Sequence, residues 1–187
     1  MKMKRFVIAF ITCLMALTWS TSATAQNTRE LTRQERKALQ AQIDSMQFAE
    51  ALQAVNDTMF TLEANRVVFK YGQTAYVTSN TNFVSVHKGK AVVQVAFNVP
   101  FMGLNGLGGV TVQGRVNKYV KREDKNTVYV DMDVFGTGIS AHVTVQLYKG
   151  GNEASVDITP NLNSNRLTLK GNLLPTAKSN VFRGEVL

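Results

Sequence analysis

The sequence predicts an all-β domain, an antiparallel meander of about eight or nine strands that forms a flattened barrel or a sandwich, with an N-terminal α-helix. Two observations predict this class. Apolar and polar residues alternate along many segments after Asp57, which is typical of strands with one face in a core and one in solvent. Short connections containing Gly, Asn or Pro leave no room for crossover helices, and this excludes a parallel βαβ architecture.

The N-terminus has the layout of a secretory signal peptide. Three basic residues within the first five positions precede an apolar run over residues 6–19, and an Ala-x-Ala sequence ends at Ala25. The apolar run is shorter than the roughly 20 residues of a transmembrane helix. We therefore expect residues 1–25 to be a signal peptide cleaved after Ala25. The mature protein would be exported, periplasmic or extracellular, with no transmembrane segment after signal removal.

Composition excludes several kinds of site. The one cysteine, Cys13, lies in the predicted signal peptide, so the chain can form no intrachain disulfide and offers too few thiolates for a cysteine zinc site. The formal net charge of the whole chain is +8, but three of its 21 basic residues belong to the signal peptide. The mature chain has 162 residues with 18 basic and 13 acidic side chains, a net charge of +5. We expect no cofactor, no metal and no nucleic-acid partner.

A helix is expected over residues 26–57. Neither proline nor glycine occurs between residues 28 and 57, and the segment is rich in good helix formers. Thr32 and Glu35 have the spacing of a capping box, in which each side chain satisfies a backbone amide of the other residue.

An apolar stripe follows the second half of this helix. Phe48, Leu52, Val55 and Met59 are spaced four, three and four residues apart, which places them on one helical face. One interpretation is that the stripe covers part of the β domain. The other is that Phe48, Leu52 and Val55 dock a partner protein of the cell envelope. We favour the first, because surface helices commonly pack such a stripe on their own core.

The β domain is expected over residues 58–187. The clearest alternation lies in residues 91–99, 128–135, 139–148, 154–159 and 166–170. Weaker candidates are residues 60–64, 67–71, a stretch near Tyr76, 84–86 and 110–112. Residues 121–126, which end a basic segment, are expected to form an exposed hairpin turn.

A polar face on this meander is the first candidate site. If the turn at residues 136–138 closes a hairpin with a shared apolar face, one register places His142 opposite Asp131 and the other opposite Asp133. The following hairpin adds Asp157 to the same outer face. Carboxylates beside an imidazole can bind a divalent cation or act as acid and base. The simpler interpretation, which we favour, is a solvated strand face with a cross-strand charge pair.

The Gly-rich segment over residues 101–109 is the second candidate. It contains no Gly-Lys-Ser/Thr sequence and precedes no predicted helix, so it does not match a phosphate-binding loop. It can fold back to fill core space, or cover the mouth of a barrel that holds a small ligand. The second interpretation gives the candidate ligand-binding residues Phe101, Met102, Leu104 and Leu107.

The chain also resembles a known family. Residues 60–66, 78–86 and 110–116, together with the exported N-terminus and the charged helix, are similar to the small exported bacterial proteins of domain of unknown function 4251. The resemblance covers about residues 34–174. It implies an envelope or secreted setting in a Gram-negative bacterium, and it implies no activity, substrate or site residue.

These observations favour an exported binding or structural module of the cell envelope over an enzyme. Its partner would be a small apolar ligand held in the β domain, or an envelope protein. One alternative is a hydrolytic or metal-assisted enzyme that uses His142 with Asp131, Asp133 and Asp157. Another is a protein-docking module that acts through the N-terminal helix.

Overall fold

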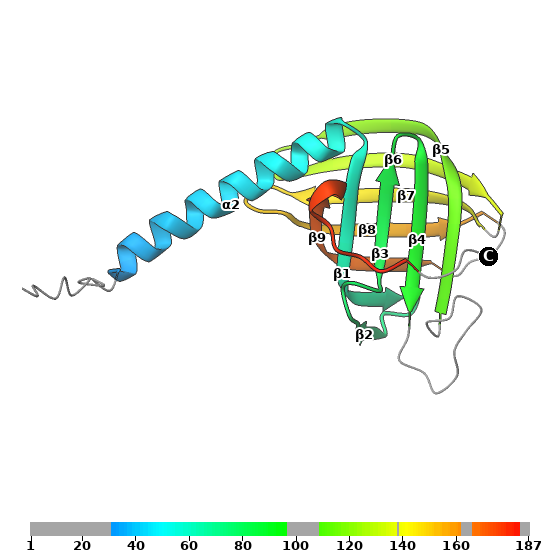
Figure 1. Cartoon of the computed structure of the whole chain (residues 1–187), viewed down its shortest axis with the longest axis horizontal. Helices are drawn as coiled ribbons and strands as arrows, with labels where there is room; N and C mark the ends of the chain where they lie inside the picture. The colour runs from blue at the N-terminus through cyan, green and yellow to red at the C-terminus, as the bar shows by residue number, and fades with distance from the viewer. Residues whose placement is uncertain (1–30, 97–108, 138, 162–165, 184–187) are drawn as a thin grey trace, which may run out of the picture. The chain divides into compact units, whose positions relative to one another are not determined.

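A computed structural model describes residues 31–96, 109–137, 139–161 and 166–183 (Figure 1). The described elements are α2 (Arg33–Asn56), β1 (Met59–Phe69), β2 (Thr74–Tyr76), β3 (Phe83–His87), β4 (Lys90–Ala96), β5 (Gly109–Glu123), β6 (Thr127–Gly136), β7 (Ile139–Tyr148), β8 (Glu153–Pro160), β9 (Leu167–Pro175) and a short 3₁₀ turn (Thr176–Lys178). The predicted all-β class with an N-terminal helix is confirmed. No helix within these ranges combines the length and the apolar character needed to cross a membrane.

The strands form a closed antiparallel barrel. Eight of them pair in the order β1-β3-β4-β5-β6-β7-β8-β9, and β9 pairs with β1 to complete the circle (Figure 1). The ninth strand, β2, pairs with β1 at Arg66–Val68, beyond the part of β1 that pairs with β3. Closure leaves the barrel strands without a free edge along their paired lengths. Of the two architectures left open by the sequence, the barrel is the one observed.

Closure depends on a close backbone approach between β1 and β9. The register shifts between Ala64 and Arg66, which marks a bulge in β1, and Gly171 of β9 lies opposite Ala64. A Cβ atom on Gly171 would collide with the carbonyl oxygen of Glu63 and lie 2.9 Å from Cα of Ala64. The absence of a side chain at Gly171 therefore allows the two strands to meet.

The first turn of α2 confirms the predicted capping box. The backbone N–H of Glu35 donates to Oγ1 of Thr32 at 3.2 Å, and the N–H of Thr32 donates to Oε2 of Glu35 at 2.7 Å. The two side chains satisfy backbone donors that the helix itself leaves without partners. The described helix begins at Arg33, directly after Thr32 of the capping box, and residues 26–30 of the expected helical segment lie outside the described residues.

The apolar stripe of α2 packs on the barrel core. Ala51, Ala54 and Val55 are buried in the same hydrophobic cluster as the inward-facing strand residues, and Phe48 and Leu52 are partly buried against it. The interpretation that the helix covers the β domain is confirmed. Because the barrel already uses this face, it is not the open docking surface that the protein-docking alternative requires.

Polar contacts anchor the last turn of the helix. The Tyr119 hydroxyl donates to the carbonyl oxygen of Val55 at 2.7 Å, and Nζ of Lys121 donates to Oδ1 of Asn56 at 2.6 Å. Burial raises the pKa of Tyr119 well above its usual value, so the phenol remains a hydrogen-bond donor. Met59, which the helical spacing included in the stripe, is instead the first residue of β1.

The strand boundaries differ from the predictions at several places, and β9 continues to Pro175, beyond the predicted residues 166–170. The candidate at residues 60–64 and the first part of that at 67–71 belong to one strand, β1, which ends at Phe69. The bulge between Ala64 and Arg66 changes the phase of the alternation, so the two parts look separate in the sequence. Strand β5 continues to Glu123, so the turn before β6 occupies residues 124–126 instead of 121–126. The β5–β6 pairing is irregular between Asn117 and Val120, where Lys118 has a positive φ of 54°. This irregularity interrupts the alternation of apolar and polar residues, so the sequence pattern does not show that the strand continues beyond it.

Candidate functional site

A largely apolar pocket lies at one end of the barrel. Its volume is about 630 Å³, and the last residues of β1, β4 and β8 line it together with the first residues of β5, β7 and β9. Of the 14 described residues that line it, 11 are aliphatic, aromatic or proline. Such a volume falls within the range of about 300–1,000 Å³ that is typical of small-molecule sites.

At the other end of the barrel, large interior side chains are fully buried. Helix α2 ends at Asn56 beside the start of β1, whereas Phe69 at the end of β1 lines the pocket. A strand rises about 3.3 Å per residue, so Phe60 and Phe69 lie about 30 Å apart along β1. Phe60 and Leu62 are fully buried, in the same cluster as the covering residues of α2. The interior is therefore packed around Phe60 and Leu62 and open at the pocket end, and a second pocket of about 470 Å³ beside the helix end is lined by residues of α2, the start of β1 and the 3₁₀ turn.

The pocket lining contains both small and large side chains. Ala141, Val93 and Val112 are among its residues, and Phe69, Ile139 and Leu167 are larger and only partly buried.

The charged side chains at the pocket are basic. Lys70 and Arg166 belong to the lining, and none of its described residues is an Asp or Glu. Nζ of Lys70 lies 5.3 Å from the ring centroid of Tyr71. A guanidinium nitrogen of Arg166 lies 3.0 Å from Oδ2 of Asp157, on the outside of the barrel.

The sequence did not identify the pocket residues. Its candidates Phe101, Met102, Leu104 and Leu107 lie outside the described residues, and their role stays a prediction. An inward-facing valine at a strand end shows the same alternation as one in the packed core, so periodicity does not separate the two. One available signal was position along the chain, since Val95 and Val110 flank the Gly-rich segment.

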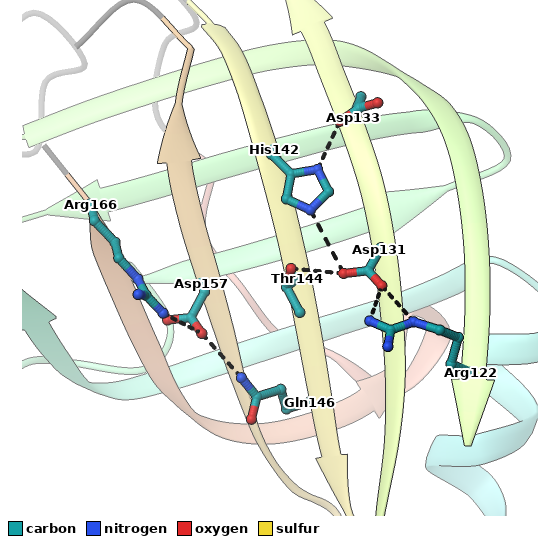
Figure 2. Close-up of polar contacts among 8 residues, drawn as sticks. All are labelled: Arg122, Asp131, Asp133, His142, Thr144, Gln146, Asp157 and Arg166. Atoms are coloured by element: carbon teal, nitrogen blue, oxygen red, sulfur yellow. Dashed lines mark hydrogen bonds and ion pairs between the residues drawn. The ribbon is translucent and has the colours of Figure 1, made fainter. Parts of the chain in front are cut away.

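The predicted polar face does form on β6 and β7 (Figure 2). The β6–β7 register pairs Asp133 with His142, the second of the two registers left open by the sequence. Nδ1 of His142 lies 2.8 Å from Oδ1 of Asp133, and its Nε2 lies 3.7 Å from Oδ1 of Asp131. Nε of Arg122 donates to Asp131 at 3.0 Å, and the hydroxyl of Thr144 donates to it at 2.9 Å.

Asp157 forms a separate group on β8. It pairs with Thr144 across the β7–β8 ladder, as predicted, but its carboxylate contacts Gln146 and Arg166 (Figure 2). The hydroxyl of Thr168 also donates to it. Within the described ranges, no three His, Cys, Asp or Glu side chains are placed to hold a metal ion. The arrangement is a network of cross-strand pairs on the outer face, on the other side of the sheet from the pocket.

Comparison with known proteins places the chain in a family. Residues 42–173 match the model of a domain of unknown function, DUF4251. This chain belongs to the DUF4251 family. No curated protein matches it. Among solved structures it is similar to a DUF4251 family protein from Bacteroides eggerthii DSM 20697, with 47% sequence identity, coverage of 76% of this chain and 96% of that chain, and a TM-score of 0.65.

The matched part of the DUF4251 domain contains the features described above. It includes the second half of α2, strands β1 to β8 and most of β9. All residues that line the pocket and all residues of the polar face fall within it. Both are therefore parts of the domain itself.

The polar face makes the stability of this DUF4251 domain depend on pH. Burial opposes the ionisation of Asp131, but hydrogen bonds from Arg122 and Thr144 and the charge of Arg122 outweigh it and lower the pKa below its usual value of 3.8. A carboxyl group with a lowered pKa stabilises the fold above its unfolded-state pKa, and this contribution is lost as pH falls through the folded-state pKa.

We expect Asp131→Asn to reduce the free energy of unfolding by about 1 kcal/mol at about pH 7. The difference from wild type should vanish below the lowered pKa of Asp131, because the protonated carboxyl group no longer attracts Arg122. Urea unfolding followed by circular dichroism between about pH 7 and about pH 3 measures this. Arg122→Gln should flatten the same pH dependence, and a stability difference that stays constant with pH would contradict the assignment.

Proposed function

We propose that this DUF4251 domain is an exported binding module that holds a small apolar ligand in the pocket of its barrel. The observation that carries the proposal is the asymmetry of the interior. One end is packed with large side chains and covered by α2, and the other contains a pocket of about 630 Å³ with a mainly apolar lining. Barrels of about eight strands are just wide enough to hold one small ligand.

Incomplete burial of the lining supports this proposal. Val110 faces the pocket with 49% of its surface exposed, and Phe69, Ile139 and Leu167 are only partly buried. Inward-facing residues further along the same strands are almost fully buried. A ligand in the pocket would remove this apolar surface from water, which contributes roughly 25 cal/mol per Å².

Export is supported by the N-terminal sequence. The basic start, the apolar run over residues 6–19 and the Ala-x-Ala sequence ending at Ala25 support secretion and cleavage. These residues lie outside the part of the chain that the structure describes. N-terminal sequencing of the protein isolated from its own cell envelope or medium tests the proposal. A chain that begins at Gln26 supports it, and a chain that retains residues 1–25 refutes it.

Filling the pocket should abolish ligand binding. We expect the mature wild-type domain to bind N-phenylnaphthylamine, an uncharged probe that fluoresces in apolar surroundings, with saturation at one probe per chain. Ala141 is an inward-facing residue of the lining, so Ala141→Phe should weaken this binding by about tenfold or more, or about 1.4 kcal/mol. The measurement is a fluorescence titration at equal protein concentrations.

The control introduces the same side chain on the same strand. His142 is the next residue of β7 and faces outward, so His142→Phe should leave probe binding unchanged. If Ala141→Phe fails to fold, Val110→Trp fills the pocket from a more exposed position. Absence of saturable binding to the wild type, or equal binding to the pocket-filled variants, would refute the proposed function.

A further inference from the structure

We propose that residues 179–183 form a strap that regulates the pocket. While the strap is docked on the outer face of β4 and β5, the pocket binds its ligand tightly, and when the strap detaches, the affinity falls. This inference rests on the proposed function and concerns the regulation of the same pocket. The observation that carries it is that the strap is tied to β4 directly behind the residues of β4 and β5 that line the pocket.

The strap follows the 3₁₀ turn and crosses the outside of the barrel from β1 towards β5 (Figure 1). At its start, the hydroxyl of Ser179 and the backbone N–H of Asn180 donate to Oε1 of Glu63 on β1, at 2.8 and 3.2 Å. At its end, the guanidinium group of Arg183 donates to Oε1 of Gln113 on β5. The strap therefore joins strands that are separated by β3 and β4 in the barrel.

The side chain of Gln94 ties the middle of the strap to β4. Its amide nitrogen donates to the carbonyl oxygens of Phe182 at 2.7 Å and Thr81 at 3.0 Å, and its Oε1 accepts a hydrogen bond from the hydroxyl of Thr111 at 3.0 Å. The N–H of Phe182 donates to the carbonyl oxygen of Asn80 at 2.7 Å. Gln94 is fully buried. A buried amide group needs hydrogen-bond partners, and the strap supplies one of them.

The same two strands form part of the pocket wall. Gln94 pairs with Thr111 across the β4–β5 ladder. The residue pairs on both sides of it line the pocket: Val93 with Val112, and Val95 with Val110. Successive residues of a strand point to opposite faces of the sheet, so the strap and the pocket lie on the two sides of one strand pair. A docked strap therefore holds this part of the wall from outside.

The strap can detach while the barrel stays closed. Residues 179–183 belong to no strand of the described sheet, and the barrel closes through the β1–β9 ladder. The side chain of Phe182 is 59% exposed, and Arg183 is exposed as well. Segments with few buried apolar contacts open at a lower free energy than the core does. Detachment thus removes the outer support of the wall without unfolding of the domain.

Removing the strap should weaken ligand binding. We expect the mature chain that ends at Lys178 to bind N-phenylnaphthylamine about fivefold or more weaker than wild type, the lower limit of a typical coupling between two sites. The matched control ends at Arg183, so it keeps the strap and lacks only residues 184–187, and it should bind as the wild type does. The measurement is a fluorescence titration at equal protein concentrations, with circular dichroism to establish that each chain is folded.

A substitution at the tie tests the same contact in the full-length mature chain. Gln94→Leu removes the hydrogen bond to the strap and should also weaken probe binding. Gln146→Leu makes the same change at a glutamine of β7 that contacts Asp157 instead of the strap, and it should leave probe binding unchanged. If Gln94 acts through the strap, Gln94→Leu should weaken binding less in the chain that ends at Lys178 than in the full-length mature chain.

Reciprocity between the two sites provides a test that needs no variant. If the docked strap strengthens ligand binding, a bound ligand must make detachment of the strap rarer by the same factor. Amide hydrogen exchange of the wild type, followed by nuclear magnetic resonance, should show slower exchange of the Phe182 N–H with saturating N-phenylnaphthylamine. Exchange of the Lys149 N–H, which donates to Asn126 at the other end of the barrel, should not change.

The possible failures can be told apart. If the probe does not bind the wild type, the proposed function is wrong, and the inference about the strap falls with it. If the probe binds equally well to the folded chain that ends at Lys178, only the inference about the strap is wrong. If that chain does not fold, the exchange measurement decides, because unchanged exchange of the Phe182 N–H in the presence of the probe would overturn the coupling.

Discussion

Gly171→Ala is expected to destabilise the barrel by about 3 kcal/mol, at the upper end of the cost of forcing extra atoms into a packed site. The added Cβ would collide with the carbonyl oxygen of Glu63 and lie 2.8 Å from its carbonyl carbon. Both atoms are backbone, so they cannot move aside as the end of a flexible side chain can. The collision falls on the β1–β9 ladder that closes the barrel, beside the bulge after Ala64.

Urea unfolding of the mature domain measures this effect. The only tryptophan, Trp19, lies in the predicted signal peptide, so circular dichroism is the appropriate signal. Gly151→Ala is the matched control, because a Cβ there meets no atom within 4 Å, and we expect it to change stability by about 0.5 kcal/mol or less. Equal stability of the two variants would show that β1 and β9 do not approach as closely as described.

Phe60→Ala is expected to cost about 3–5 kcal/mol of unfolding free energy, the usual penalty for removing a buried phenylalanine. Phe60 is fully buried in the core cluster at the helix end of the barrel. Phe69→Ala makes the same chemical change on the same strand, but Phe69 is partly buried and lines the pocket. We expect it to cost clearly less stability and to weaken binding of N-phenylnaphthylamine.

Thermal or urea unfolding and probe titration of the two variants measure these opposite effects. Weakened probe binding in a stable Phe69→Ala variant would locate the ligand at the pocket end of the barrel. Equal losses of stability at Phe60 and Phe69 would instead indicate that both ends are packed alike, and the asymmetry that supports a binding function would be absent.

Much of the local structure could be predicted from the sequence. Thr32 and Glu35 form the capping box that their spacing indicates, and the stripe through Phe48 and Leu52 packs on the core. His142 lies opposite one of the two aspartates that the alternation allowed, Asp133. These features depend on residues a few positions apart or joined by one short turn, so the local pattern contains the information that determines them.

The pocket could not be predicted in the same way. Ala141 lines the pocket and Val143 is buried in the core, yet they are consecutive inward-facing residues of one strand and continue one alternation. Lys70 and Arg166 are far apart in the chain, and only the last pair of the β1–β9 ladder shows that they share a rim. The sequence placed its candidate ligand-binding residues in the segment 101–109 because that segment interrupts the strand pattern.

The sequence by itself determined the all-β class, the presence of the helix and its capping box, the antiparallel order of neighbouring strands and the residues of the polar face. Each of these follows from propensity, periodicity or short connections. Only the tertiary structure decided that the sheet closes, where β1 and β9 meet, and which end of the barrel is open. These depend on the pairing of segments from opposite ends of the β domain and on the summed volume of inward side chains, and no local pattern encodes either one.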